Sequence, residues 1–271
     1  MEMTMQLVEQ HVISKTDPRY AAIDRAAFAS KNLYNSALYE IRQSFIHQEK
    51  YIYYNQMDKI MQKHETYQGL PRKVSQQVLK LLDKNWKSFF KALQAYNQDP
   101  SKFLGRPRLP KYKDKTQGRN VLVYTIQAIS KPALKQGIIK PSGLSIEIKT
   151  NQKTVDQVRI VPHNGFYMVE VVYERGEMQT HVYPAFLAAV DIGVNNLVAL
   201  TSNKNGFVPR LVNGRPIKSI NQYYNKQREH LQKKMSKNHH ISRELERITN
   251  KRTRRIDHYM HTPHHDALLT C

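Results

Sequence analysis

The sequence predicts an α+β protein in which a block of helices is followed by an antiparallel sheet and then by a second unit of strands and helices. The prediction rests on the spacing of apolar residues. They recur at helical spacing through most of the first hundred residues, alternate from about residue 121, and return to helical spacing after about residue 216. Because 40% of the 271 residues are hydrophobic, the chain can also build a core.

The first hundred residues predict a short strand and a small helical bundle. Residues 5–13 are expected to be extended, and Asp17-Pro18 then supplies an N-cap and first-turn pair for a helix that ends near residue 47. A short helix is expected at 55–64 and a long one at 72–97, with Trp86 in the core rather than exposed for stacking on a base.

A Pro-rich, basic segment follows the break at Asp99-Pro100 and predicts an extended, exposed arm. Its prolines exclude it from a helix interior. Cations beside an aromatic ring on a stiff arm suit phosphate contact with stacking on a base, although an ordinary solvated linker is the alternative. The residues expected to bind nucleic acid here are Arg106, Arg108, Lys111, Tyr112 and Lys113.

Alternating apolar residues beyond the arm predict an antiparallel sheet or small barrel. Asn164-Gly165 lies between two alternating segments, which is a strong hairpin signal. The expected strands are residues 121–127, 137–140, 144–149, 157–161 and 166–174.

A second unit is expected after Pro184. It should begin with strands at 186–191, 197–202 and 207–213 and continue as basic helix over residues 216–259. Residues 201–271 hold 15 Lys and Arg against 5 Asp and Glu, a net charge of +10, so nearly half of the charge excess lies here.

The charge balance favours nucleic acid as the partner. The chain has 43 Lys and Arg against 22 Asp and Glu, a formal net charge of +21, and neutralising phosphates releases condensed counterions. An acidic membrane is disfavoured because no lipidation motif or basic amphipathic anchor is found, and a merely basic, ribosome-like surface is the alternative.

The apolar segments indicate where in the cell the protein is found, and the cysteine content limits its disulfides and zinc sites. The longest apolar runs, such as 185–190, are too short to cross a bilayer, and residues 1–10 lack the core of a signal peptide. A cytoplasmic, nucleoid-associated protein without a membrane partner is therefore expected. Cys271 is the only cysteine, which excludes an intramolecular disulfide and a zinc finger.

Asp191 follows an apolar strand pattern and precedes Gly193 and a second apolar strand. A buried strand would deliver this carboxylate to the edge of a sheet, where a divalent metal could bind, and glycine would allow the sharp reversal. An Asp that hydrogen-bonds its own turn is the alternative. The residues alone leave both interpretations open.

Three segments in this order resemble those of TnpB-type, transposon-encoded RNA-guided nucleases, which are relatives of compact type V CRISPR effectors. They are Gly105–Lys113, Asp191–Leu200, which is similar to the first RuvC segment, and Asn213–Lys226. The resemblance extends over about residues 1–262.

The resemblance implies a wedge-type β-barrel with an inserted helical recognition bundle, followed by a partial RNase H-like (RuvC) domain. Residues 1–15 would begin the barrel and 16–100 would form the recognition region. Residues 101–183 would contain the basic arm and the rest of the barrel, and 184–271 the partial RuvC domain with its long basic helix.

By this resemblance, Asp191 would be the first of three catalytic carboxylates that bind two Mg²⁺ ions. The family's second carboxylate is a Glu on a strand after the basic helix, and its third lies beyond a four-cysteine zinc finger. Neither is found in this sequence, and the residues after Thr262 depart from the family pattern, which we interpret as a frameshift or premature stop. The missing strands should leave Ala188 and Val190 poorly covered.

The resemblance also selects nucleic-acid-binding residues in the second unit. Lys218, Asn221 and Lys226 lie in the third matching segment. Charges are expected to cover most of the following helix rather than one stripe, as in a phosphate-lined channel or an RNA scaffold site, and a solvated helix is the alternative. These charges are Arg243, Arg247, Lys251, Arg252, Arg254 and Arg255, of which the last three are the strongest candidates.

The sequence therefore predicts a TnpB-like protein that binds a guide RNA and DNA but lacks a complete cleavage site. Residual Mg²⁺-dependent nuclease activity through Asp191 is the enzymatic alternative. Two further interpretations are a non-catalytic regulator that binds nucleic acid and the non-functional product of a decayed gene.

Overall fold

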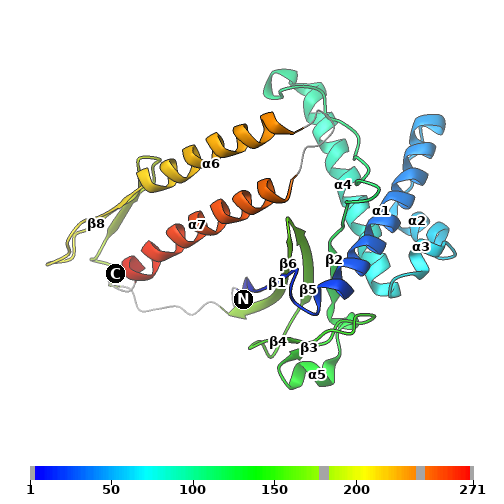
Figure 1. The fold of residues 1–271 in the computed structure, drawn as a ribbon, viewed down its shortest axis with the longest axis horizontal. Coiled ribbons are helices and arrows are strands. Elements are labelled where there is room, and N and C mark those ends of the chain that lie inside the picture. Colours follow the sequence, from blue (N-terminus) through cyan, green and yellow to red (C-terminus); the bar gives the residue numbers. More distant parts are fainter. Residues whose placement is uncertain (1–3, 177–182, 236–241, 269–271) are drawn as a thin grey trace. The chain divides into compact units, whose positions relative to one another are not determined.

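The computed structural model describes residues 4–176, 183–235 and 242–268. The chain divides into two compact units, Met1–Glu177 and Met178–Cys271, whose elements are drawn in Figure 1.

The first unit is built on a four-stranded antiparallel sheet in the order β1-β6-β5-β2. Strand β1 pairs along its whole length with β6, from Thr4 opposite Gly176 to Ser14 opposite Phe166. The first strand of the unit is therefore the neighbour of its last, and every helix of the unit is inserted between strands of one sheet. The strands are β1 (Thr4–Ser14), β2 (Leu122–Thr125), β5 (Gln157–His163) and β6 (Phe166–Gly176).

The predicted hairpin at Asn164-Gly165 is confirmed. Strands β5 and β6 flank it, and Gly165 has a φ of 83°, a left-handed conformation that a residue without a Cβ adopts without steric cost. The first β-strand of the chain, predicted at residues 5–13, is also confirmed.

Of the antiparallel sheet or small barrel that the pattern predicted, the structure shows the sheet and no closed barrel among the residues it describes, because the sheet is open with β1 and β2 at its edges. Strands β3 (Ile138–Ile139) and β4 (Ile148–Lys149) were expected to extend the sheet, but each has only two residues, and they pair with one another. Pro141 and Gly143 lie between them and shorten both strands. Barrel closure needs longer, staggered strands.

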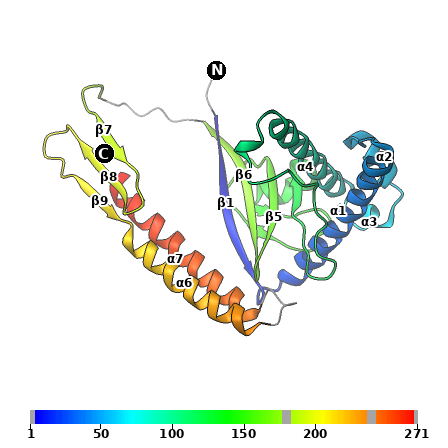
Figure 2. The same ribbon diagram turned by 90° about the horizontal axis from the view of Figure 1, so that it is seen from above.

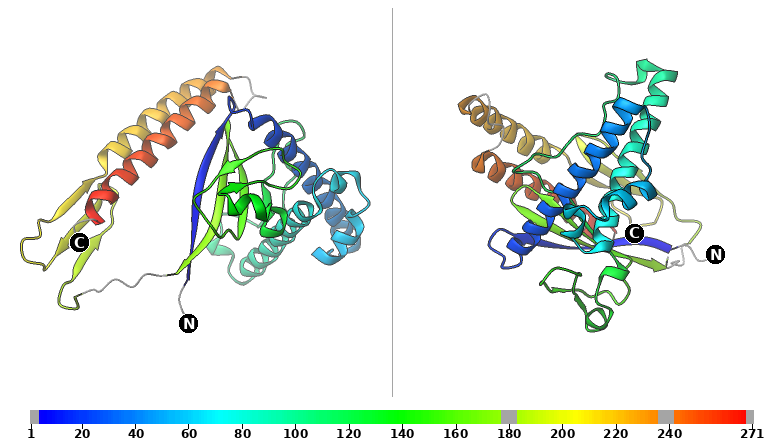
Figure 3. Two further views of the ribbon diagram at one scale, coloured as in Figure 1. Left: turned by 90° about the horizontal axis from the view of Figure 1, so that it is seen from below. Right: turned by 90° about the vertical axis from the view of Figure 1, so that its right-hand side faces the viewer.

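Helices α1 and α4 pack on one face of this sheet (Figure 3), α2 and α3 pack against these two helices, and the predicted core position of Trp86 is confirmed. Trp86 is fully buried, and the rings of Phe45 and Phe90 lie 5.3 Å and 5.7 Å from it. Edge-on and tilted ring pairs at such distances are favourable. The helices are α1 (Tyr20–Gln48), α2 (Tyr54–Met61), α3 (Glu65–Gln68) and α4 (Arg72–Gln98), and a short α5 (Lys131–Lys135) follows β2.

The predicted N-cap of the first long helix is wrong. The helix begins at Tyr20 with Arg19 as its N-cap residue, and no side chain caps it. Asp17 instead accepts hydrogen bonds from the backbone N–H and the guanidinium of Arg19, at 2.6 to 2.9 Å. These bonds from Arg19 lower the pKa of Asp17 to about 2. The Asp17 carboxylate therefore stabilises the turn before the helix instead of capping the first helical turn.

The second unit contains a three-stranded antiparallel meander and two long helices. Strands β7 (Ala188–Asp191), β8 (Asn196–Ser202) and β9 (Arg210–Asn213) follow one another in the sheet. Helices α6 (Arg215–Lys234) and α7 (Arg243–Leu268) lie side by side and antiparallel (Figure 2).

Strand β7 is exposed along its length, with Val190 57% exposed. The expectation that Ala188 and Val190 are poorly covered is confirmed within the described residues. The simpler expectation of two buried strands is wrong, because only Leu200 of β8 is buried. An antiparallel meander without a covering layer cannot bury its apolar face.

Candidate nucleic-acid interface

The basic arm is extended, as predicted, but it is held along α1 rather than free. The side-chain amide of Asn35 donates to the carbonyl of Lys113, and the Lys113 N–H donates to Asn35 Oδ1, both at 2.9 Å. Arg42 donates to the carbonyl of Pro110 at 3.4 Å, and its guanidinium lies 5.2 Å from the Tyr112 ring. Helix α1 therefore fixes the backbone of the arm at two points.

The candidate residues of the arm face two directions. Arg106, Arg108, Lys111 and Tyr112 are exposed. Lys113 instead turns toward α1, where its ammonium lies 5.2 Å from the Tyr34 ring, and burial lowers its pKa. The structure therefore groups the first four and separates the fifth, whose phosphate contact stays a prediction.

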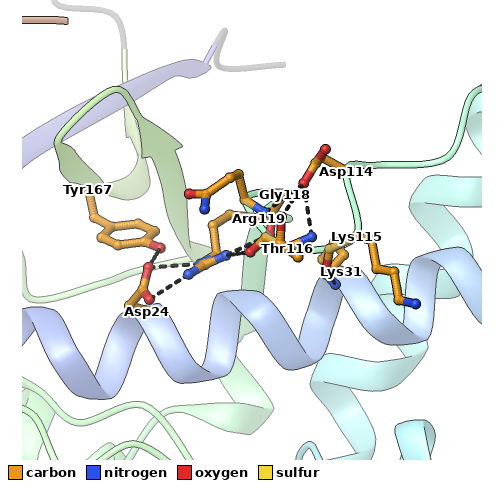
Figure 4. A network of polar contacts seen from close by, with 9 residues as sticks. Asp24, Lys31, Asp114, Lys115, Thr116, Gly118, Arg119 and Tyr167 are labelled. Atoms are coloured by element: carbon orange, nitrogen blue, oxygen red, sulfur yellow. Dashed lines mark hydrogen bonds and ion pairs between the residues drawn. The ribbon is translucent and has the colours of Figure 1, made fainter. Parts of the chain in front are cut away.

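The end of the arm is fixed by a polar network (Figure 4) that the sequence analysis missed. Arg119 donates to both carboxylate oxygens of Asp24 on α1 at 2.8 Å, and the Tyr167 hydroxyl from β6 donates to Asp24 at 2.7 Å. The bonds from Arg119 hold the pKa of Asp24 below its usual range. One carboxylate thus joins the arm, a helix and the sheet.

Lys31 makes a second attachment in the same region. It is 2% exposed, its ammonium donates to the carbonyl of Lys115 at 2.7 Å, and it lies 3.8 Å from the Phe28 ring. At the other end of the arm, Phe103 packs against Tyr96 of α4 with 5.7 Å between ring centroids. The arm is therefore anchored at both ends, and we call residues 103–119 the strap.

In the second unit, two segments that carry the sequence resemblance lie in direct contact. The Gly214 N–H donates to the carbonyl of Asn195 at 2.6 Å, and the Lys218 ammonium donates to Asn195 Oδ1. A Cβ atom at position 214 would overlap the carbonyl oxygens of Val194 and Asn195, which explains the glycine. The Tyr259 hydroxyl adds a bond to the carbonyl of Asn213 at 2.5 Å.

Three of the predicted nucleic-acid contacts therefore have partners within the chain. The Lys218 ammonium is bonded to Asn195. Arg252 donates to Asn221 Oδ1 at 2.8 Å, and its guanidinium lies 5.6 Å from the Tyr224 ring. The two contacts of Arg252 join α7 to α6. Lys226, Arg254 and Arg255 remain exposed, as a binding role requires.

The charges of α7 are more one-sided than predicted. Arg252 faces α6, whereas Arg247, Lys251 and Arg255 follow one another at intervals of four residues on an exposed side of the helix. With Arg254 they line a shallow depression of about 520 Å³. The spacing of four residues between these cations in the sequence could have predicted that they share one side of the helix.

Asp191 lies at the exposed end of β7, opposite Ala199 of β8. Within the described residues, its carboxylate makes no hydrogen bond to its own turn, and no group of three or more His, Cys, Asp or Glu side chains could hold a metal ion. Mg²⁺ sites combine several oxygen ligands, and a two-metal centre needs bridging carboxylates. The described residues therefore do not fit such a centre.

Residues 170–266 match the sequence model of the OrfB_IS605 family, described as "Probable transposase". The match spans both segments that the Asn195–Gly214 contact joins. This part of the chain is similar to that transposase family.

Two solved structures are similar to this chain. A Cas12f1–sgRNA–target DNA complex has a TM-score of 0.32 at 12% identity, covering 92% of this chain and 65% of that one. A CRISPR-Cas12f ternary complex has a TM-score of 0.36 at 12% identity, covering 87% and 57%. The chain spans less than two thirds of the length of either. A search of curated protein sequences finds no significant match.

In the part of the chain that the structure describes, no helix has an apolar stretch that could cross a bilayer.

Proposed function

We propose that this chain is a TnpB-type protein that binds a guide RNA and DNA through cations presented on two locally rigid supports. One observation carries the proposal: outward-facing Lys and Arg side chains occupy the strap and α7 without a carboxylate partner among the described residues. They are Arg106, Arg108 and Lys111 on the strap and Lys251, Arg254 and Arg255 on α7.

Electrostatics distinguishes these cations from others in the chain. Arg119, Lys140 and Lys233, for example, form ion pairs with carboxylates at 2.6 to 2.8 Å. Like charges left unpaired on one helix repel each other, and a phosphate backbone removes this repulsion while releasing counterions. The attachments of the strap reduce the conformational entropy that binding would cost.

The architecture supports the same assignment. A sheet whose first strand pairs with its last, with helices inserted between them, is compatible with a wedge domain (1–15 and 101–183) that holds a recognition region (16–100). The β7-β8-β9 meander followed by basic helices is compatible with a partial RNase H-like domain at 184–271. Guide pairing would then read sequence, while protein holds the backbone.

For cleavage, we propose that these 271 residues by themselves are incompetent. In intact relatives, the resemblance implies an Mg²⁺-dependent RNA-guided DNA endonuclease. Asp191 is the one carboxylate at the expected position, and no group of three or more His, Cys, Asp or Glu side chains that could hold a metal occurs among the described residues. The chain would therefore act as a binding protein.

The test compares two triple variants in RNA binding across a salt series. Arg106→Gln/Arg108→Gln/Lys111→Gln removes three outward cations of the strap. Lys87→Gln/Lys140→Gln/Lys233→Gln removes three cations that form ion pairs with carboxylates. We expect the first to lower affinity and to flatten the slope of log affinity against log salt by about 2 to 3. Equal slopes and affinities for the two triples would contradict the proposal.

A further inference from the structure

A groove of about 380 Å³ runs between α6 and α7 in the second unit. Ile220 and Ile248 line it from the two helices, together with Tyr223 and Tyr224. Its volume lies within the range of roughly 300–1,000 Å³ that is typical of small-molecule sites. Isoleucine side chains beside tyrosine rings are suited to contact with a flat, apolar ring.

The two tyrosines of the groove differ in their surroundings. Tyr224 is fixed, since its hydroxyl lies 3.0 Å from Thr249 Oγ1 and Arg252 lies over its ring. Tyr223 is 65% exposed at the rim. An exposed ring beside an apolar floor can stack on an incoming ring, and nucleobases present such a face in every sequence.

The wall that α7 contributes is cationic. Arg247, Lys251 and Arg255 line the groove at intervals of four residues, so successive charges are about 6 Å apart along the helix axis. A row of cations beside an aromatic ring is complementary to a strand with phosphates on one side and unpaired bases on the other. A duplex, whose bases are stacked and paired, would present no free base to Tyr223.

One acidic residue in the groove offers hydrogen-bond acceptors beside the cations. Glu244 also lines it, and each of its carboxylate oxygens accepts a hydrogen bond from Arg247, at 2.9 Å and 2.5 Å. Each oxygen retains a lone pair. A carboxylate repels phosphate but accepts from a hydroxyl, and the ribose 2′-OH is the hydroxyl that DNA lacks.

We propose that this groove holds one unstacked nucleotide of a single-stranded RNA segment. Its base stacks on Tyr223, its flanking phosphates contact Arg247, Lys251 and Arg255, and its 2′-OH donates to Glu244. The inference rests on the proposed function and adds to it the strandedness and the sugar of the ligand.

The experiment uses the full chain and a single-stranded RNA of about ten nucleotides that carries 2-aminopurine. Binding should change the 2-aminopurine fluorescence. Tyr223→Ala should weaken binding by roughly five- to 150-fold and abolish the fluorescence change. Tyr223→Phe keeps the ring and should recover both. Tyr183→Ala is the matched control, because Tyr183 is 75% exposed in the same unit but lies outside the groove.

Two further arms test the strand and the sugar. The same sequence as double-stranded RNA, or as single-stranded DNA, should bind more weakly than the single-stranded RNA. Glu244→Gln should reduce the difference in affinity between single-stranded RNA and single-stranded DNA. Equal binding of RNA and DNA, or of single and double strands, would overturn the inference.

The experiments distinguish a failure of this inference from a failure of the proposed function. If the strap triple variant lowers affinity while Tyr223→Ala behaves like Tyr183→Ala, the groove is not a nucleotide site and nucleic-acid binding stands. If the unmodified chain binds no RNA and no DNA, both fail.

Discussion

The N–H of Gly214 donates to the carbonyl of Asn195, and this bond joins two segments 19 residues apart that both carry the resemblance to the TnpB family. The Lys218 ammonium is bonded to the same asparagine through its side chain. The turn after Asp191 is therefore held by the start of α6. A motif that resembles a binding segment has a visible structural role.

Gly214→Ala should destabilise the second unit. A Cβ atom there would overlap two backbone carbonyl oxygens, which cannot move without distorting the turn at Val194 and Asn195. We expect a loss of roughly 1–3 kcal/mol, typical of overpacking. Denaturant unfolding measures it. Gly105→Ala is the control, since a Cβ at Gly105 would meet no atom within 4 Å. Equal stability of the two variants would contradict the steric argument.

Lys218→Met separates a structural role from a phosphate contact. Loss of the bond to Asn195 should lower the unfolding free energy by roughly 0.5–1.5 kcal/mol. The salt dependence of RNA binding should stay unchanged, because the ammonium is already used within the chain. Lys251→Met, which removes an exposed cation, should instead reduce the salt slope by about 0.7 to 0.9. A reduced slope for Lys218→Met would restore the sequence-based role.

Acid should weaken the first unit through Asp24. The bonds from Arg119 lower the pKa of this carboxyl, so the folded state binds the proton less tightly than the unfolded state. The stabilisation is fully present above about pH 4 and is lost as the pH falls through the lowered pKa. Urea unfolding at pH 7 and at pH 3 should therefore differ more for the unmodified chain than for Asp24→Asn.

The contribution of the pair itself can be measured at pH 7. Arg119→Met should cost roughly 1.5–3 kcal/mol, since it removes two charged hydrogen bonds in a partly buried pair. Lys140→Met, which removes a more exposed ion pair with Glu147, should change stability little. Similar losses in both variants would show that burial does not strengthen the Asp24 pair.

The predictable part of this fold is the part that local pattern dictates. Apolar spacing located α1, α4, α6 and most strands, and Asn164-Gly165 located the hairpin, because both signals act over a few residues. The pairing of β1 with β6 was not predictable from pattern, since it joins residues more than 150 positions apart. The pattern left both an antiparallel sheet and a small barrel open, because strand length, rather than strand identity, decides closure.

The candidate site divides in the same way. Residue type identified Arg106, Arg108, Lys111, Arg254 and Arg255, and all five are exposed. It did not show that Lys113, Lys218 and Arg252 have partners inside the chain, because their partners Tyr34, Asn195 and Asn221 are distant or neutral. Tyr223 was missed because exposure depends on how α6 packs against α7.

These 271 residues by themselves should not cleave DNA. Two Mg²⁺ ions need several fixed oxygen ligands before water is activated between them, and Asp191 at the exposed end of β7 supplies one carboxylate. The measurement incubates the chain, a guide RNA and a matched DNA target with Mg²⁺ or Mn²⁺, after a binding assay has shown that the complex forms. Asp191→Ala is the control for contaminating nuclease, and both proteins should leave the DNA intact. Guide-directed cleavage by the unmodified chain that Asp191→Ala abolishes would show that the missing ligands are supplied in some other way, by a second copy or by residues outside the described ranges.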